Sequence, residues 1–345
     1  MSKPTMQDIA DALSTSRITV WKALNNRPGV SSEMRERIHQ KCEELGYIRG
    51  GSPAPAGAGS GPASRTVAAV VSRPESSVFW MEIIHQLAKE LSLRGINLMY
   101  TYLPSFYKEN YNLPPALSDG SVSGIIVMNV YSEELLRMLA ELSTPKIFLD
   151  SVPSVTFAEL NSSLVMIEGR CMVREITERL LDTGRRRLCF IGDINYAQTN
   201  TDRYHGFLDA FASRGLSVDP AYTMTGHLGL RTHYEEISAF LHGLPALPQG
   251  FVCASDYIAH FIERYYTEHT GVDPSSLVLT GFDNNAEYAN IAEQITTVDV
   301  DTKALGARLG NKILFAMDHP LASYELSYIN SDILYRGPLA EGAEG

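Results

Sequence analysis

The chain has 345 residues, a net charge of −11 and four cysteines. This length is enough for two or three domains with a sizeable buried core. The sequence has no run of about 18 apolar residues, and its N-terminus lacks the apolar core of a secretion signal, so we expect a cytoplasmic protein with no membrane partner. The cysteines lie far apart and form no CxxC pair, which argues against a disulfide framework and a zinc site.

Charge is unevenly distributed along the chain. Residues 1–49 hold eight basic and six acidic side chains, a net charge of +2, so the remainder carries −13. Residues 50–64 consist only of Gly, Ala, Pro and Ser, a composition that disfavours both helix and strand. We therefore predict a head at 1–49, a flexible linker at 50–65 and a body at 66–338. The alternative is a structureless loop within a single domain.

The head has the pattern of three short helices. Thr5, with Asp8 three residues later, predicts the start of the first helix, and Ser16 predicts the start of the second. A third helix fits residues 31–45. Two short helices separated by a tight turn suit insertion into the DNA major groove, because the second helix shows polar and basic side chains near its N-terminus. The alternative is a three-helix packing module with a solvated outer face.

Over residues 5–49 the head closely resembles the headpiece of the LacI family of bacterial transcription regulators. The matching features are the I-A-x-x-L start, S-x-x-T-V at the second helix, and R-E-R-I leading to E-L-G-Y. The resemblance implies that Arg17 and Ile18 read bases and that Lys22 replaces an arginine that contacts DNA. Trp21 departs from the small residue usual at its position. The expected DNA contacts are Thr5, Ser16, Arg17, Ile18, Thr19, Lys22 and Asn25.

From Thr66 onward, short apolar runs alternate with helical patterns. Such runs include TVAAVVS at 66–72, GIIVMNV at 124–130 and RLCFIGD at 187–193. This alternation indicates parallel βαβ units, in which ligands bind beyond the carboxyl ends of the strands. Four aspartates are expected at such ends: Asp150, Asp193, Asp256 and Asp283.

The body has no motif for a cofactor or a catalytic centre. No GxGxxG follows a strand, and neither GxxxxGKS/T nor GxSxG occurs. The nearest metal motifs, His233-Tyr-Glu-Glu and Asp299-Val-Asp301, are short and common. We therefore expect no cofactor, no metal and no enzyme activity.

The body also resembles the effector domain of the LacI family. The matching blocks are FLD at 148–150, T-G-R-R-R-L-C-F-I-G at 183–192, C-A-S-D at 253–256 and G-F-D-N at 281–284. The resemblance implies an α/β fold class: an all-α helix-turn-helix headpiece followed by a periplasmic-binding-protein-like domain of two Rossmann-like parallel-sheet lobes joined by three crossovers. Lobe one is expected at 66–157 and 294–323, and lobe two at 158–293 and 324–338.

By the same resemblance a small molecule, with a sugar as the expected class, binds in the cleft between the lobes. Arg203 is expected to donate to hydroxyls or a carboxylate, because its guanidinium forms a planar fork of donors. Without the resemblance, Arg203 would be a surface helix cap, the aspartates strand-end caps and the aromatics core residues. The expected effector contacts are Phe79, Trp80, Asp150, Arg203, Ser255 and Asp283, with Tyr131 and Tyr196 in loops nearby.

Two departures from the family pattern stand out. Glu168, Gly169 and Met172 replace residues common in relatives, so we expect a reshaped cleft. Residues 50–64 contain no leucine and three prolines, so they cannot form the family's hinge helix, which kinks DNA through the minor groove. A loose tether would let the two heads of a dimer accept variable half-site spacing.

The resemblance implies a ligand-responsive transcription regulator, expected to be a repressor, that binds a pseudo-palindromic operator in double-stranded DNA as a homodimer. The alternative is a soluble sugar-binding or sensing protein without operator binding, which the modest head charge and the missing hinge helix leave open. A sugar-acting enzyme is a third reading, but no carboxylate pair can be assigned as acid and base.

Overall fold

The computed structural model describes residues 5–24, 29–45, 65–72, 77–229, 231–273 and 276–340. The chain divides into two compact units, Met1–Ser60 and Gly61–Gly345. Within the described ranges, no helix combines the length and the apolar character needed to cross a bilayer.

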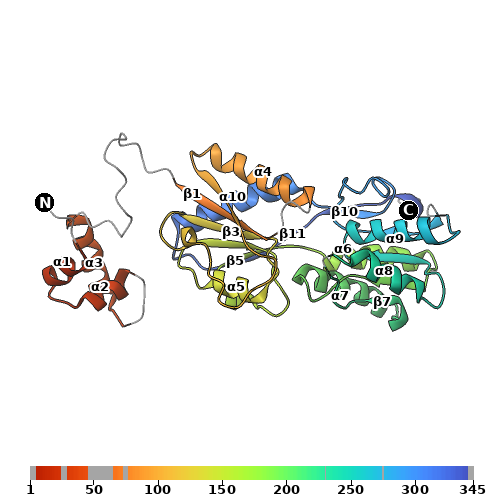
Figure 1. The fold of residues 1–345 in the computed structure, drawn as a ribbon, viewed down its shortest axis with the longest axis horizontal. Helices are drawn as coiled ribbons and strands as arrows, with labels where there is room; N and C mark the ends of the chain where they lie inside the picture. The colour runs from red at the N-terminus through yellow and green to blue at the C-terminus, as the bar shows by residue number, and fades with distance from the viewer. Residues whose placement is uncertain are drawn as a thin grey trace. The chain divides into compact units, whose positions relative to one another are not determined.

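The described part of the first unit is all-α, as predicted (Figure 1). It contains α1 (Met6–Ala12), α2 (Arg17–Leu24) and α3 (Ser32–Leu45). Thr5 and Asp8 form a capping box at the start of α1, which satisfies backbone donors that the first helical turn leaves unpaired. The fully buried core consists of Ile9, Ala10, Val20, Ala23 and Ile38.

The second unit begins with a six-stranded sheet in the order β11-β5-β4-β3-β1-β2, in which every neighbouring pair is parallel. The strands are β1 (Thr66–Val71), β2 (Asn97–Tyr102), β3 (Gly124–Met128), β4 (Lys146–Leu149), β5 (Ser163–Ile167) and β11 (Leu326–Ile329). This sheet, with its helices, is lobe one.

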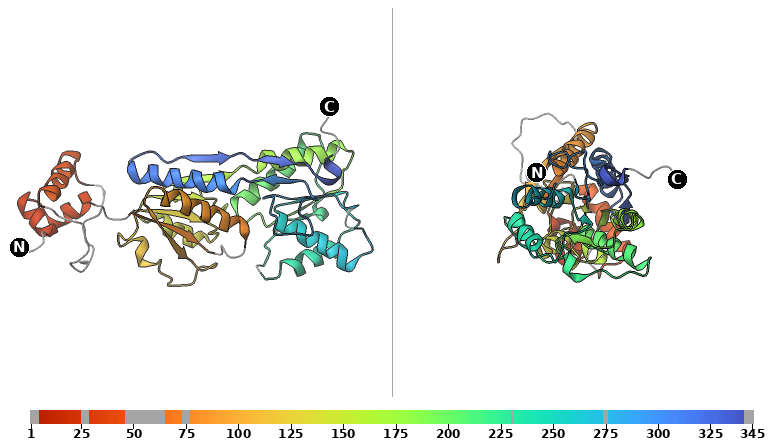
Figure 2. Two further views of the ribbon diagram at one scale, coloured as in Figure 1. Left: turned by 90° about the horizontal axis from the view of Figure 1, so that it is seen from above. Right: turned by 90° about the vertical axis from the view of Figure 1, so that its right-hand side faces the viewer.

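Both faces of the lobe-one sheet are covered by helices. On one face, alternate strand residues such as Val67 and Val71 join the cluster of α4 (Val78–Ser92) and α10 (Thr302–Asp318). Figure 2 shows these two helices side by side. On the other face, Ala68 and Val70 join the cluster of α5 (Glu133–Ala140). Because side chains alternate along a strand, these nearly continuous apolar runs supply two buried faces.

Lobe two has a parallel four-stranded sheet in the order β7-β6-β8-β9. Its elements are α6 (Arg170–Asp182), β6 (Leu188–Ile191), α7 (Gln198–Ala212), β7 (Thr223–Met224), α8 (His233–His242), β8 (Gly250–Cys253), α9 (Asp256–His269) and β9 (Leu279–Thr280). Gly206 lets α7 cross α6 closely, since a Cβ there would lie 2.2 Å from the carbonyl oxygen of Arg170. In Figure 1 the two lobes lie next to each other, lobe one with α4 and α5, lobe two with α6 to α9. The predicted α/β class with two parallel-sheet lobes is confirmed.

The expected lobe limits need correction. β5 and β11 pair within the sheet of lobe one, so residues 163–167 and 326–329 belong there and not to lobe two. Conversely, β10 (Thr297–Asp299) pairs with β12 (Asp332–Leu334), and the backbone N–H of Asp283 donates to the carbonyl of Val298, 3.0 Å away. The segment from 294 to 301 therefore continues lobe two, and the chain returns to lobe one only at α10.

Candidate functional site

The outer face of α2 is the first candidate site. Ser16 caps this helix: the backbone N–H of Thr19 donates to Ser16 Oγ over 3.0 Å, and the two hydroxyls lie 2.8 Å apart. Beyond this cap Arg17 is exposed, and Ile18 and Trp21 expose 66% and 45% of their surface. A cation beside exposed apolar side chains at the N-terminus of a short helix suits base edges, where arginine donates to guanine and apolar groups contact the thymine methyl.

The remaining predicted DNA contacts are placed differently. Thr5 is used by its own helix, because its hydroxyl donates to Asp8 Oδ2 at 2.8 Å and accepts from the backbone N–H of Asp8 at 3.3 Å. The hydrogen bonds that the Thr5 hydroxyl and backbone N–H donate to the Asp8 carboxylate lower the pKa of Asp8. Lys22 is half-buried at the end of α2. Asn25 lies outside the described residues.

The second candidate site is a cavity of about 320 Å³ between the two lobes of the body. Its walls come from the carboxyl ends of β3, β4 and β6 and from the N-termini of α4, α7, α8 and α9. All six expected effector residues contribute to its lining: Phe79, Trp80, Asp150, Arg203, Ser255 and Asp283. The volume lies at the lower end of the roughly 300–1,000 Å³ typical of small-molecule sites.

Arg203 is held firmly at the base of this cavity. It is 95% buried on α7; its Nη1 donates to the carbonyl of Ala254, and its guanidinium carbon lies 3.6 Å from the centre of the Phe282 ring. Its Nε has no hydrogen-bond partner among the described residues. Gly169 makes room for it, since a Cβ at 169 would lie 2.8 Å from Arg203 Cγ. A buried guanidinium with an unsatisfied N–H favours a ligand that accepts hydrogen bonds.

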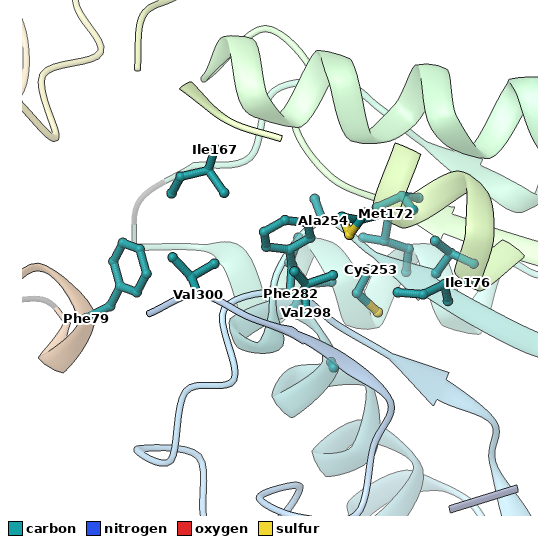
Figure 3. Close-up of a cluster of buried hydrophobic side chains, with 14 of the residues drawn as sticks. Phe79, Ile167, Met172, Ile176, Cys253, Ala254, Phe282, Val298 and Val300 are labelled. Atoms are coloured by element: carbon teal, nitrogen blue, oxygen red, sulfur yellow. The ribbon is translucent and has the colours of Figure 1, made fainter. Parts of the chain in front are cut away.

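Figure 3 shows part of the apolar core of the body, in which Phe79 and Ile167 also line this cavity. Phe282 lies near Met172 and Ala254, while the Phe79 ring lies beside Ile167 and Val300. Phe79 is therefore at once a cavity wall and a core residue. Its neighbour Trp80, which meets it edge-on with ring centres 5.2 Å apart, is only partly buried.

Asp283 places a carboxylate in the cavity wall that can accept hydrogen bonds from a ligand. Its carboxylate has an ion-pair contact, 3.7 Å from Arg203 Nη2, and no hydrogen bond within the described part of the chain. Burial raises the pKa of Asp283 to about 6, although the charge of Arg203 opposes this shift. Ser255 adds a hydroxyl to the lining and precedes α9 without capping it through its side chain.

Asp256, next to Ser255, has a structural role. Its carboxylate accepts from the Asn285 backbone N–H and from the Thr297 hydroxyl, each at 2.7 Å, so it anchors the loop that presents Asp283. Burial, with the nearby charge of Asp283, raises the pKa of Asp256 to about 7.

Asp150 is less available than the sequence suggested. Its carboxylate accepts from the Thr199 hydroxyl at 2.7 Å, the Ser151 backbone N–H at 2.8 Å and the Tyr131 hydroxyl at 3.3 Å. Burial raises the pKa of this carboxyl, and the hydrogen bonds from Thr199 and Ser151, together with the charge of Arg203, oppose the shift. Because Tyr131 belongs to lobe one and Thr199 to lobe two, Asp150 holds the two lobes together at the cavity wall.

Three cavity residues have left-handed backbone conformations: Asn129, Asp150 and Asp283, with φ of 53°, 66° and 100°. Each directly follows a strand or the strand-end segment after β9. Non-glycine residues adopt such angles rarely, and they concentrate at functional sites.

Sequence reasoning missed several lining residues: Asn129, Thr199, Asn200, Tyr257, Asn285 and Tyr288. His233, considered only as part of a metal motif, also lines the cavity. Only Asn285 had a signal in the sequence, because it directly follows the block G-F-D-N at 281–284, whose aspartate was expected at the end of a strand.

The cavity carries an excess of negative charge. Its lining contains the carboxylates of Asp150, Asp193 and Asp283 and one guanidinium, that of Arg203. Among the described residues, no group of three His, Cys, Asp or Glu side chains is placed to hold a metal ion. Glu168, one of the departures noted above, caps α6 by accepting from the backbone N–H of Cys171 at 2.8 Å.

The comparisons with known proteins concern the two units of the chain. Residues 5–50 match the model of bacterial regulatory proteins of the lacI family, and residues 177–336 match the periplasmic binding protein-like domain. The chain is 25% identical over 307 residues to the HTH-type transcriptional repressor PurR of Pasteurella multocida (strain Pm70), covering 88% of this chain and 89% of that relative.

Two solved structures share the fold along nearly the whole length. One is the transcriptional regulator CelR–cellobiose complex, with a TM-score of 0.69, 22% identity, and coverage of 97% of this chain and 99% of that one. The other is the lac repressor dimer bound to operator and the anti-inducer ONPF, with a TM-score of 0.63, 17% identity and the same coverage. With a family headpiece joined to a periplasmic-binding-protein-like domain, the chain belongs to the LacI family of bacterial regulatory proteins.

Proposed function

We propose that this protein is a ligand-responsive transcription regulator, most simply a repressor, that binds a pseudo-palindromic operator as a homodimer in the cytoplasm. The similar PurR is named a transcriptional repressor, and the similar lac repressor structure is a dimer bound to operator. The relatives are regulators and not enzymes, which supports a binding role for the cavity.

The observation that carries this proposal is the presence of two complementary sites on one chain. The head offers Arg17 and Ile18, both exposed, in the first turn of α2, whose N-terminus is capped by Ser16. The body offers a cavity between its two lobes, with a buried guanidinium and a carboxylate that accepts no hydrogen bond from the described residues. A binding protein without a regulatory role has no need for the first site, and a constitutive DNA-binding protein has no need for the second.

The effector we propose is a neutral sugar. Three carboxylates and one guanidinium line the cavity, so a sugar phosphate or a sugar acid would add negative charge to an already anionic, partly desolvated site. A polyol suits the same groups, because its hydroxyls donate to Asp283 and accept from Arg203. The partly buried Trp80 offers an aromatic face for a sugar ring. The structural neighbour CelR, which contains cellobiose, supports this ligand class.

DNA binding and sugar binding must be coupled through the segment between the two units, which lies largely outside the described residues. Its composition lacks the leucine of a hinge helix. We propose that the effector changes the separation of the two heads in the dimer, and with it the effective concentration of the second head at its half-site.

Selection of bound sequences from a random duplex pool by the full-length protein tests this function. We expect a palindrome whose half-sites occur at more than one spacing. Binding should weaken steeply as the salt concentration rises, because the protein displaces cations from the DNA when it binds and added salt opposes their release. A single fixed spacing would contradict the loose tether but not the regulator. Absence of any enriched sequence would contradict the regulator itself.

A further inference from the structure

A second cavity, of about 360 Å³, lies at the outer end of the same inter-lobe cleft. Its lobe-one wall includes Ser105, Phe106, Tyr107 and Glu133, and its lobe-two wall includes Asn195 and His227. Like the inner cavity, it is built from segments that follow the carboxyl ends of strands, here β1, β2, β3, β6 and β7. Nothing in the function argued so far uses it.

The inner and outer cavities share a wall. Asn129, Tyr131, Asp193 and Tyr196 line both. Tyr131 comes from lobe one and Tyr196 from lobe two, and their ring centres lie 4.5 Å apart with an angle of 44° between the planes. The two cavities therefore adjoin each other between the lobes, separated by this wall, and each is at the lower size limit for a small ligand.

The outer cavity has an aromatic platform that is not part of the core. Phe106 and Tyr107 expose 62% and 38% of their surface. They lie in the connection between β2 and β3, residues 103–123, whose only regular element is a short 3₁₀ helix at Pro115–Leu117. Connections of this length are uncommon in compact domains and are usually functional. Large exposed aromatic side chains at such a position suit stacking on a ring of a ligand.

Polar groups complete the outer compartment. Asp193 is 95% buried, and its Oδ2 accepts from the backbone N–H of Leu228 and contacts Nδ1 of His227, both at 3.1 Å. That contact fixes the largely exposed imidazole at the cavity wall. Carboxylate, amide, imidazole and hydroxyl groups beside aromatic faces are the combination that recognises a polyhydroxylated ring, since hydroxyls both donate and accept.

We propose that this outer cavity is a second sugar subsite, so that the effector is a neutral disaccharide whose two rings occupy the inner and outer compartments. This inference rests on the proposed function in that it concerns the same cleft. Phe106 and Tyr107 stack on the second ring, and Tyr131 and Tyr196 lie beside the glycosidic link. Glu133 and Asp193 keep the outer compartment anionic, so phosphorylated disaccharides are disfavoured.

Calorimetric titration of the full-length protein tests the proposal. The probes are the monosaccharides glucose, galactose, mannose and xylose and the disaccharides cellobiose, maltose, lactose and trehalose. We expect at least one disaccharide to bind about tenfold more tightly than its constituent monosaccharides. If no disaccharide exceeds its own monosaccharides, the second subsite is wrong.

A pair of variants locates the second ring. The double variant Phe106→Ala, Tyr107→Ala should weaken disaccharide binding by about tenfold and leave monosaccharide binding unchanged. Phe315→Ala, which removes an equally exposed aromatic from α10 outside both cavities, is the matched control and should change neither. Equal loss for both sugar classes would overturn the assignment.

Two further readouts separate the possible failures. Phenyl β-glucoside should bind more weakly than the best disaccharide; equal affinity would mean that the outer cavity takes an apolar group and not a sugar. Operator selection by the same protein reports independently on the proposed function. Selected operators without a disaccharide preference overturn the subsite alone, whereas absence of selected operators overturns the regulator.

Discussion

Oδ1 of Asp283 lies 3.7 Å from Nη2 of Arg203, close enough for charge attraction and too far for a direct hydrogen bond. The donor and the acceptor therefore lie side by side in the lining of the cavity. A sugar hydroxyl that bridges them from the cavity side can accept from the guanidinium and donate to the carboxylate. This pair is the centre of the proposed effector site.

Replacing Asp283 by asparagine should weaken sugar binding about tenfold or more, since a hydrogen bond to a charged group contributes roughly 1.5–3 kcal/mol. The thermal stability of the ligand-free body should not fall, because the Asp283 carboxylate accepts no hydrogen bond from the described residues. Calorimetry and a melting curve on the same variant separate the two effects. A large drop in Tm together with unchanged affinity would assign Asp283 a structural role.

Sugar affinity should depend on pH through the same residue. Burial raises the pKa of Asp283 to about 6 in the ligand-free protein. A ligand hydroxyl that donates to the carboxylate favours its charged form, so binding should lower this pKa. Affinity should therefore rise as pH increases from 5 to 7.5 and then level off. The Asp283→Asn variant should have a flat profile over this range, and a rise that persists in the variant would point to another group.

Gly169→Ala should weaken sugar binding by displacing Arg203. The added Cβ would lie 2.8 Å from Arg203 Cγ, which is too close, and this side chain is packed between Gly169 and Phe282. Gly271→Ala is the matched control, because a Cβ there meets no atom within 4 Å. We expect an affinity loss of several fold to about tenfold for the first variant only, measured by calorimetry. Equal behaviour of the two variants would show that the position of Arg203 tolerates the shift.

Arg17→Ala should relax operator specificity by roughly 1–3 kcal/mol at one base position of each half-site. The side chain is exposed beyond the Ser16 cap, so its removal should not unfold the head. Binding of the selected operator and of single-base variants, compared with the wild-type protein, measures the effect. A uniform loss on every duplex would instead indicate a phosphate contact.

Much of this architecture could be predicted from sequence. The caps at Thr5 and Ser16 fixed the starts of two helices, and the alternating apolar runs predicted the parallel sheets. β5 and β11 were missed because their runs, Ser163–Ile167 and Leu326–Ile329, were not among the apolar runs interpreted as strands, and no local pattern encodes the pairing of β11 with the distant β5. Their omission displaced the expected lobe limits.

The sequence predicted several residues that line the cavity, but not which hydrogen bonds each of them makes within the protein. Chain position alone suggested that Asp150 and Asp283 lie at strand ends. In the structure the Asp150 carboxylate is already hydrogen-bonded by Tyr131, 19 residues earlier in the chain, and by Thr199 of lobe two. Both aspartates also have left-handed backbone angles, which affect where their side chains lie. No local pattern encodes such contacts.

The most direct test measures operator affinity by fluorescence anisotropy, with and without a saturating concentration of the sugar found by calorimetry. For the wild-type protein we predict a change in Kd of at least about fivefold, the lower end of typical allosteric coupling. Arg203→Ala should retain the ligand-free Kd and lose the response, and Arg203→Lys serves as a second variant should the first fold poorly. A wild-type Kd unaffected by the bound sugar, or a full response of both variants at the wild-type sugar concentration, would contradict control of DNA binding through this cavity.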